Sequence, residues 1–296
     1  MSADDLELRQ EISGPGVYPG MPAAQYRGDP APAKDGGSLS RSGASRLVPP
    51  STPAAFDEWR RGGDTETSDA LNFGQAAHTH VLSEGAAIVV VDAADWRTKD
   101  ARAERDAAVA AGRIAILPKH RAVVEAMAAK LREHPIASQL LAPSTGDPEV
   151  SLFWRHPRTE RWCRARPDFL RHTGIGRRYV IPDYKTAADA SAEAFGKSAA
   201  DYGYHQQHPW YVDGVKALGI DPDPVFLFIV QEKRRPYLVN VIELDEDAVE
   251  VGRRLNDIAV TRFHNCTTAG IWPGYGEGVA LASLPPWILR REDISA

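Results

Sequence analysis

The spacing of apolar residues predicts mostly helices in the first half of the chain. Apolar positions recur at helical intervals in several segments, and hydroxyl or proline residues stand where those segments begin. Ser38 to Ser42 offer hydroxyls as N-caps, and Thr52-Pro53 restarts a helix after Pro49-Pro50. The expected helices cover residues 38–47, 53–61, 68–82, 98–111 and 119–134, and one strand is expected at 87–91.

From Glu149 the pattern changes to strands that alternate apolar and polar residues. Three consecutive strands joined by short turns are expected, then a long helical stretch with a kink or a helix start near Pro209, two more strands and a last helix. This order implies an α/β (α+β) fold in which a mixed sheet packs against helices. The segments are 149–156, 161–172, 177–187, 192–218, 225–232, 237–244 and 245–263.

The two ends of the chain differ from this central region. Residues 1–37 are rich in Gly, Pro and Ala without a sustained period, so we expect a flexible or extended N-terminal arm. Residues 38–263 are expected to form a single domain with a helical N-terminal part. Residues 264–296 then form a C-terminal extension.

Composition describes an ordinary globular protein of 296 residues, with 43% hydrophobic and 25% charged residues and a net charge of −5. No apolar run approaches the ~18 residues that span a membrane, and the acidic N-terminus lacks the features of a signal peptide. We therefore expect no membrane association and a cytoplasmic location. Cys163 and Cys266 are too few for a four-cysteine metal site, and their isolation predicts free thiols.

The candidate chemistry is concentrated in the stretch that ends in Asp183-Tyr184-Lys185. Asp183 and Lys185 are two residues apart after an apolar run, so on a strand both side chains face the same side. A hairpin could place Asp168 beside them. Two carboxylates are hard oxygen ligands suited to a divalent cation, and the lysine can hold a water or stabilise negative charge. The alternative is a salt-bridged surface hairpin.

Arginines surround these carboxylates in the sequence. This local basic character allows a phosphate-bearing substrate, and equally a solvated strand face. The arginines between Ser151 and Arg178 are Arg155, Arg158, Arg161, Arg164, Arg166, Arg171, Arg177 and Arg178.

Two further motifs lie on predicted helices. His78 ends the run Phe73-Gly74-Gln75-Ala76-Ala77-His78, where Gly74 indicates a close approach to another element. A lone histidine on an apolar helix face can equally be a satisfied core residue, and His80 would point elsewhere. Gln207 and Tyr211 are four residues apart and share one helix face, either as polar groups at a site or as the rim of an aromatic core.

The order of these motifs resembles the RecB/RecE-like branch of the PD-(D/E)XK nuclease superfamily. The pattern is F-G-x-A-x-H, then P-D, then D-x-K-T, then Q-x-x-x-Y, and the nearest likeness is to exonuclease VIII and the phage exonucleases. Further matching stretches are SLSRSGASRLVPPSTPAAF, EVSLFW and FLFIVQEKRRPY. The resemblance covers roughly residues 38 to 262 and implies a restriction-endonuclease-like core, a central mixed sheet flanked by helices.

The resemblance also implies roles for individual residues. Asp168 and Asp183 would be carboxylate ligands of the metal, His78 a metal-proximal histidine and Lys185 the catalytic lysine. The backbone carbonyl of Tyr184 would complete the metal shell. The positions that support the site or touch DNA would be Gln207, Tyr211, Arg164 and Arg166, with Glu149 as a further acidic contributor.

The function implied is a Mg²⁺-dependent (or Mn²⁺-dependent) exonuclease that degrades double-stranded DNA ends in the 5′–3′ direction during recombination or phage DNA replication and repair. The metal would polarise the phosphate and lower the pKa of a bound water, and Lys185 would stabilise the developing charge. Such enzymes resemble ring-shaped homo-oligomers, and a single-strand annealing recombinase is an expected partner.

Two alternatives stay open. One is a DNA-binding recombination scaffold of the same fold with little catalysis, against which the complete Asp/Asp/Lys set argues. The other is a metal-dependent hydrolase of small phosphorylated molecules. That activity would call for a phosphate-cradling glycine-rich loop, and neither GxxxxGK[ST] nor GxGxxG occurs in the sequence.

Overall fold

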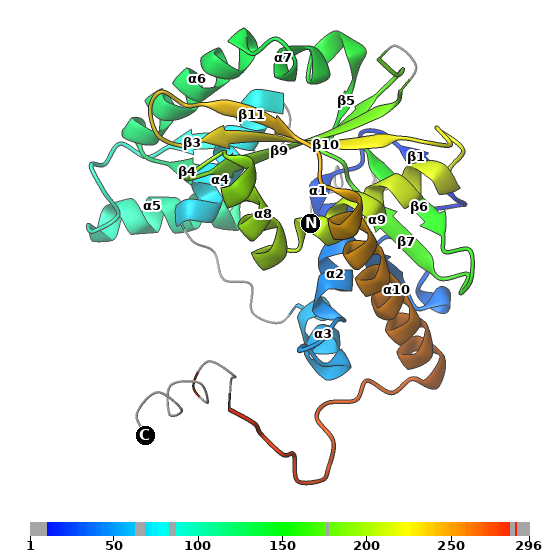
Figure 1. Ribbon diagram of the computed structural model, residues 1–296. Coiled ribbons are helices and arrows are strands. Elements are labelled where there is room, and N and C mark those ends of the chain that lie inside the picture. The colour runs from blue at the N-terminus through cyan, green and yellow to red at the C-terminus, as the bar shows by residue number, and fades with distance from the viewer. Residues whose placement is uncertain (1–10, 63–68, 83–86, 176–177, 285–287, 289–296) are drawn as a thin grey trace, which may run out of the picture.

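A computed structural model describes residues 11–62, 69–82, 87–175, 178–284 and 288 of the chain. These residues form a mixed α/β structure in which helices cover small mixed sheets (Figure 1). The predicted fold class is confirmed.

The central sheet is three-stranded and mixed, with the order β11-β10-β9. β9 (Val180–Ala187) runs parallel to β10 (Val225–Glu232), and β11 (Val239–Ile242) pairs with β10 antiparallel. Parallel neighbours need a long crossover, and α8 (Ala192–Asp201) and α9 (Tyr204–Ala217) supply it. β9 is therefore an edge strand, a position that tolerates Pro182.

A second sheet has the order β1-β6-β7-β2. β6 (Ser151–Arg155) and β7 (Trp162–Ala165) are antiparallel, with β1 (Gly16–Tyr18) on one side and β2 (Ser38–Ser40) parallel to β7 on the other. The strand expected over residues 161–172 is two strands. Pro167 has no N–H to donate to a ladder, and after it β8 (Phe169–Arg171) pairs with β5 (Gly146–Pro148) instead.

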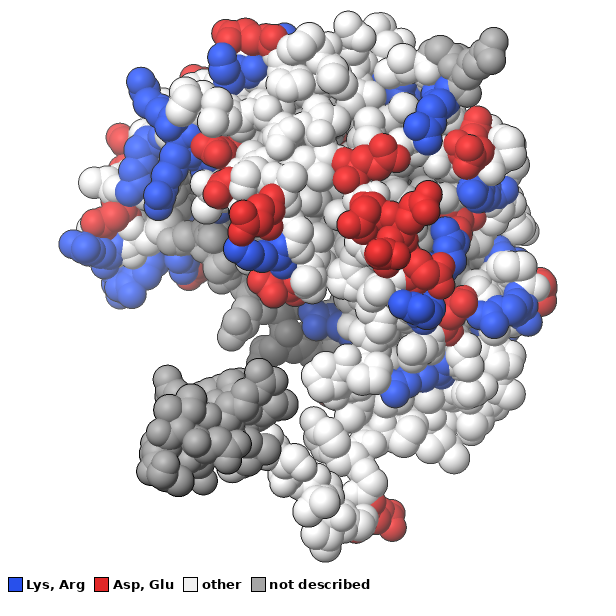
Figure 2. Space-filling model, in the orientation of Figure 1, with Lys and Arg blue, Asp and Glu red and all other residues white. Residues whose placement is uncertain are grey.

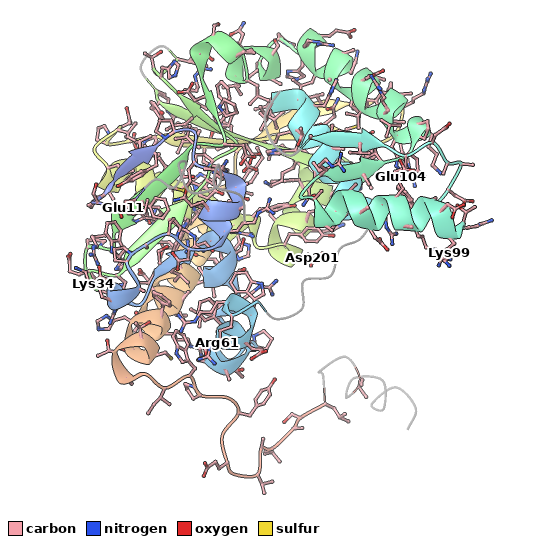
Figure 3. The ribbon with its side chains drawn as sticks, turned by 180° about the vertical axis from the view of Figure 1, so that it is seen from behind. Glu11, Lys34, Arg61, Lys99, Glu104 and Asp201 are labelled. Carbon is pink, nitrogen blue, oxygen red and sulfur yellow. The ribbon has the colours of Figure 1, made fainter. Side chains whose placement is uncertain are left out.

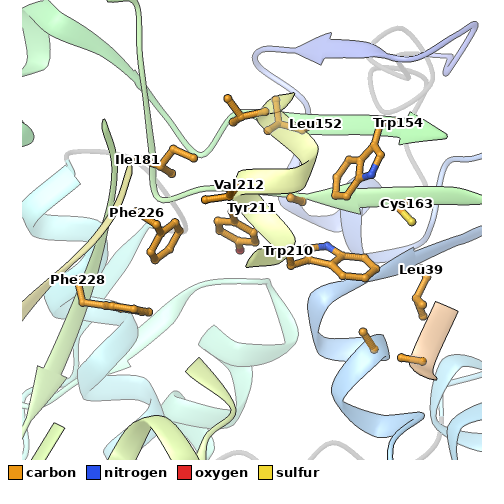
Figure 4. Close-up of a cluster of buried hydrophobic side chains, with 14 of the residues drawn as sticks. Leu39, Leu152, Trp154, Cys163, Ile181, Trp210, Tyr211, Val212, Phe226 and Phe228 are labelled. Carbon is orange, nitrogen blue, oxygen red and sulfur yellow. The ribbon is translucent and has the colours of Figure 1, made fainter. Parts of the chain in front are cut away.

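Helix α9 lies between the two sheets and carries the core that joins them (Figure 4). Trp210 packs edge-on against Trp154 of β6 with ring centroids 5.7 Å apart, and Tyr211 meets Phe226 of β10 at 5.6 Å. The last helix, α10 (Glu246–Ala269), packs along α9. A Cβ on Gly252 would lie 1.7 Å from the carbonyl oxygen of His205, so this helix crossing requires glycine.

A second hydrophobic cluster lies on the other side of β9 and β10, where Tyr184 and Ile229 pack against helices. The elements that pack on this side are α4 (Asp69–Leu82), β3 (Ile88–Val90), β4 (Ile114–Ile116), α6 (Pro118–Glu133) and α7 (Ala137–Leu140). Helix α5 (Lys99–Ala110) packs with the other face of β4 in a smaller cluster of its own. α4, β3, α5 and α6 match the expected helices and strand over residues 68–134 within a few residues, whereas β4 and α7 were not expected.

Two expectations about helices need correction. The segment from Ser38 begins as strand β2, and the helix α2 (Arg41–Arg46) starts only after Ser40, whose hydroxyl caps it, while α3 (Pro53–Arg60) begins after its cap Thr52 as expected. The long helical stretch over 192–218 is two helices, as the expected kink or helix start allowed, but the break lies at Gly203, which adopts φ +69°, and Pro209 is inside α9.

Residues 11–37 are not a free arm, contrary to expectation. They include β1, α1 (Ala23–Arg27) and a 3₁₀ turn (Ala33–Asp35), and the side chain of Met21 is 2% exposed. Tyr18 packs edge-on against Phe153 of β6 at 5.5 Å. A few apolar side chains thus anchor a segment whose Gly- and Pro-rich composition suggested flexibility. Residues 1–10 of this prediction lie outside the described residues.

The C-terminal end also differs from expectation. Helix α10 continues six residues past Phe263, because Cys266 extends its buried stripe. Trp272 then packs against Phe56 at 5.5 Å, and the following residues leave the body of the molecule beyond α3, which Arg61 marks in Figure 3. Cys163 and Cys266 are buried free thiols, as predicted. Within the described ranges, none of the helices has the length and apolar character that crossing a bilayer requires.

Candidate metal and catalytic site

The strand β9 presents Asp183 and Lys185 on one face, as the alternation predicts. Asp183 is fully buried, and its Oδ2 atom forms an ion pair with the ammonium of Lys185. Its other oxygen, Oδ1, accepts a hydrogen bond of 2.5 Å from the amide of Gln207 on α9. A buried carboxylate between an ammonium and an amide is held in place by the fold, so the surface-hairpin alternative is excluded by its burial.

Asp168 lies at the free edge of β9. It follows Pro167 in the loop between β7 and β8, and its Oδ2 atom accepts the backbone N–H of Tyr184 at 2.7 Å. β8 does not pair with β9, so the expected hairpin is absent, and this side-chain hydrogen bond brings Asp168 to Asp183 instead. The carboxylate thus accepts the hydrogen bond of a backbone N–H at the sheet edge, where no neighbouring strand supplies a carbonyl for it.

His78 approaches the same carboxylate from α4. Its Nε2 atom lies 2.9 Å from Oδ2 of Asp168, and its Nδ1 atom lies 3.5 Å from Oε1 of Glu149. Ala76 and Ala77 are completely buried, and these small residues let α4 pack closely. His80 is exposed, so one of the two histidines faces the site, as expected.

Glu149 completes this group through an unusual backbone. It adopts φ +53°, a left-handed conformation that is uncommon for a residue other than glycine, and its N–H bonds the carbonyl of Asp168 at 3.1 Å. The Oε2 atom pairs with Nε of Arg166 at 2.6 Å. Among the described residues, the ligand atoms of His78, Glu149 and Asp168 all lie within 4.8 Å of one another.

These donors fit a divalent cation. Two carboxylates and an imidazole are a ligand set that Mg²⁺ or Mn²⁺ accepts. The buried Oδ2 atom of Asp183 forms an ion pair with the ammonium of Lys185. Glu149 therefore belongs to the cluster, while Asp183 is turned toward Lys185. That Asp183 and the Tyr184 carbonyl bind metal stays a prediction.

The charges of the cluster compensate one another. Burial would lower the pKa of His78, but the carboxylates of Asp168 and Glu149 raise it to about 9. Burial likewise opposes ionisation of Asp168, yet the charges of His78 and Lys185 hold its pKa below the usual range. Burial and the nearby Asp168 raise the pKa of Asp183 to about 6. The metal-free site thus holds protons that a cation would replace.

Helix α9 supports the site with its first and second turns. Gln207 orients Asp183, and the hydroxyl of Tyr211 donates to the carbonyl of Arg166 at 3.2 Å. Their common helix face was predicted. Both side chains are buried, which fits the supporting role, and their contact with DNA stays a prediction.

The arginines expected to bind phosphate are mostly occupied within the fold. Arg164 is 7% exposed, donates to Ser38 and pairs with Asp29 at 2.8 Å. Arg166 binds Glu149 and also donates to the carbonyl of Met21 at 2.9 Å. Both therefore hold the N-terminal segment and the site together. The alternative of a solvated strand face does not fit these two side chains, which are 9% and 13% exposed, and their contact with DNA stays a prediction.

Two site residues were missed by sequence reasoning. Tyr204, the first residue of α9, places its ring 5.1 Å from Nζ of Lys185. Arg41, the first residue of α2, lies near Asp183 and Tyr204, and its buried Nε atom has no hydrogen-bond partner among the described residues. Arg41 stands in the SLSRSG stretch already noted, which was the available signal.

Comparison with known proteins agrees with this geometry. A crystal structure of a "putative exonuclease" from Eubacterium rectale is similar over 90% of this chain and 95% of that one, with a TM-score of 0.55 and 11% identity, which shows a shared fold. No curated protein matches the sequence. A family model described as a PDDEXK-like domain of unknown function (DUF3799) matches residues 51–285. The predicted superfamily is confirmed, while the RecB/RecE-like branch stays a prediction. The chain belongs to this PDDEXK-like family.

Proposed function

We propose that this protein is a Mg²⁺-dependent (or Mn²⁺-dependent) deoxyribonuclease that hydrolyses phosphodiester bonds at double-stranded DNA ends. The observation that carries the proposal is the meeting of His78, Glu149 and Asp168 beside the buried pair Asp183–Lys185. Family membership supports a nuclease, and the described similarity of fold is consistent with it.

The residues present suit phosphodiester hydrolysis. His78, Glu149 and Asp168 would hold the cation, which supplies charge to polarise the phosphate and acidify a water. Lys185 lies behind them, with its pKa raised by Asp183 and Asp168 against the effect of burial, so it stays charged at neutral pH. A charged lysine can stabilise the negative charge that develops on the phosphate oxygens.

Arg41 gives the site a second cation. Its guanidinium donates through Nη2 to the carbonyl of Tyr202 at 2.5 Å, which leaves the Nε donor without a partner in the described residues. A buried unsatisfied donor is costly unless a ligand completes it. A phosphate oxygen is the acceptor that this site would encounter.

The finer part of the proposal follows from the sequence resemblance. It comprises 5′–3′ polarity, a ring-shaped homo-oligomer around the duplex, action in recombination or phage replication with a single-strand annealing recombinase, and a cytoplasmic location. The proposed hydrolysis of DNA does not depend on any of these finer properties.

A single assay tests the hydrolysis and its polarity. Duplex DNA labelled at one 5′ or one 3′ end is incubated with Mg²⁺ and wild type, Asp183→Ala, Lys185→Ala or the surface control Glu193→Gln. Loss of mononucleotides from 5′ ends is expected for wild type and the control only. Binding without cleavage would indicate the scaffold alternative, and cutting of closed circles at the linear rate would exclude an exonuclease.

A further inference from the structure

An open cleft of about 500 Å³ lies beyond the metal cluster, between α4, the loop before α5 and the start of α6. Its walls combine aromatic rings with basic side chains. The residues of this cleft that matter here are Phe73, Trp96, Arg97, Lys119, His120 and Lys233.

The basic side chains give the cleft a positive character. Arg97, Lys119 and Lys233 line it against one carboxylate, Asp95, which already accepts the backbone N–H of Arg97 at 2.8 Å. Within the described ranges, Lys119 and Lys233 have no ion-pair partner. Figure 2 shows Lys and Arg over the β10–β11 turn, and both basic and acidic side chains around α5, the helix marked by Lys99 and Glu104 in Figure 3. Phosphate groups are the ligands that such a cleft attracts.

The aromatic side chains add flat surfaces. Trp96 is half-buried and lines the cleft. The guanidinium of Arg105 lies over its ring, 5.6 Å from the ring centroid. The ring of Phe73 meets the imidazole of His120 edge-on at 5.6 Å. Proteins bind unpaired nucleotides with aromatic rings and basic side chains together: the bases stack on the rings, and the lysines neutralise the phosphates.

The cleft is joined to the candidate active site through β9 and α4. The backbone N–H of Lys233 donates to the carbonyl of Ala187 at 3.0 Å, only two residues, or about 7 Å of strand, beyond Lys185. Phe73 precedes Gly74, where a Cβ would lie 3.6 Å from Oγ1 of Thr186. A strand that leaves the metal cluster along β9 would therefore enter the cleft.

We propose that this cleft binds one nucleotide of single-stranded DNA next to the nucleotide at the metal site. Its base stacks on Trp96, and Lys119 and Lys233 neutralise its phosphates. The inference rests on the proposed nuclease function. An unpaired strand is required because the bases of a duplex are stacked on each other and offer no free face to Trp96.

Binding without metal tests the cleft independently of cleavage. Fluorescence anisotropy of a labelled single-stranded oligonucleotide is measured in EDTA. Trp96→Ala should weaken binding about 5- to 100-fold, as expected for one lost base stack, and Trp96→Phe should retain most of the affinity. The double variant Lys119→Gln/Lys233→Gln should reduce the slope of log affinity against log salt by about 1.4.

The control variant Lys197→Gln/Lys216→Gln removes the same charge from α8 and α9. It should leave both the affinity and the salt slope nearly unchanged. Wild-type affinity in all cleft variants, or no binding of the oligonucleotide by wild type, overturns the inference even if the protein cuts DNA. Equal affinity for a free mononucleotide would contradict a strand-binding role. Absence of cleavage with the predicted binding pattern would instead count against the nuclease alone.

Discussion

Replacement of Asp183 by asparagine should stabilise the metal-free protein. The carboxyl is fully buried, and its pKa rises from 3.8 to about 6 because of burial and the charge of Asp168. Two pKa units correspond to about 3 kcal/mol of unfavourable ionisation in the folded state. Asparagine removes this cost, which already includes the attraction of Lys185, and still accepts the hydrogen bond of Gln207. We therefore expect a gain of about 2–3 kcal/mol.

The gain should depend on pH in a defined direction. Well below pH 3.8 the carboxyl is protonated in both the folded and the unfolded protein, so the variant has no advantage. Between pH 4 and pH 6 the unfolded state ionises first, which destabilises wild type progressively as the pH rises. Above pH 6 the difference should be constant.

Thermal unfolding in EDTA between pH 5 and pH 8 measures this difference. Asp183→Asn should melt about 3–6 °C above wild type at pH 7.5 and about half as far above it at pH 5, with Glu193→Gln as the unchanged control. Addition of Mg²⁺ should raise the melting temperature of wild type more than that of the variant. A lower melting temperature for the variant at pH 7.5, or an advantage that does not shrink at pH 5, would refute the reasoning.

Four further outcomes are expected. Arg166→Met should lower the free energy of unfolding in urea by about 1–3 kcal/mol, because it leaves the half-buried Glu149 without its partner, yet it should not reduce the salt dependence of DNA binding. Metal affinity measured by calorimetry should rise about tenfold per pH unit from pH 7 toward pH 9, as the proton leaves His78, and this slope should vanish in His78→Ala. Arg41→Met should reduce kcat/KM on duplex ends about 10- to 100-fold through loss of a charged hydrogen bond, without a change in melting temperature of more than a few degrees. Gly252→Ala should cost about 3 kcal/mol in urea denaturation, since its Cβ would overlap the backbone of α9.

The features that the sequence predicts well depend on short stretches. The alternation that ends in Asp183 and Lys185 places both side chains on one face of β9, and the spacing of Gln207 and Tyr211 places both on one face of α9. In each case local backbone geometry alone determines the outcome. His78 is a harder case, because only the family resemblance separates it from an ordinary core histidine.

The features that escaped prediction depend on distant partners. Arg164 resembles a phosphate-binding arginine until its partner Asp29 is known, and that residue lies far away in the sequence. Glu149 enters the metal cluster through a left-handed backbone that no residue pattern indicates. A contact between remote segments leaves no periodic signal, so the inward orientation of these side chains could be seen only in three dimensions.

The N-terminal segment has a practical consequence for shortened versions of this protein. The family match begins at residue 51, yet the carbonyl of Met21 accepts a hydrogen bond from Arg166, whose other donor fixes Glu149 beside His78. A chain trimmed to residue 51 would lose both outer strands of the second sheet and leave that guanidinium short of an acceptor. Boundaries chosen from homology alone would therefore yield a protein whose metal ligands are present but poorly aligned.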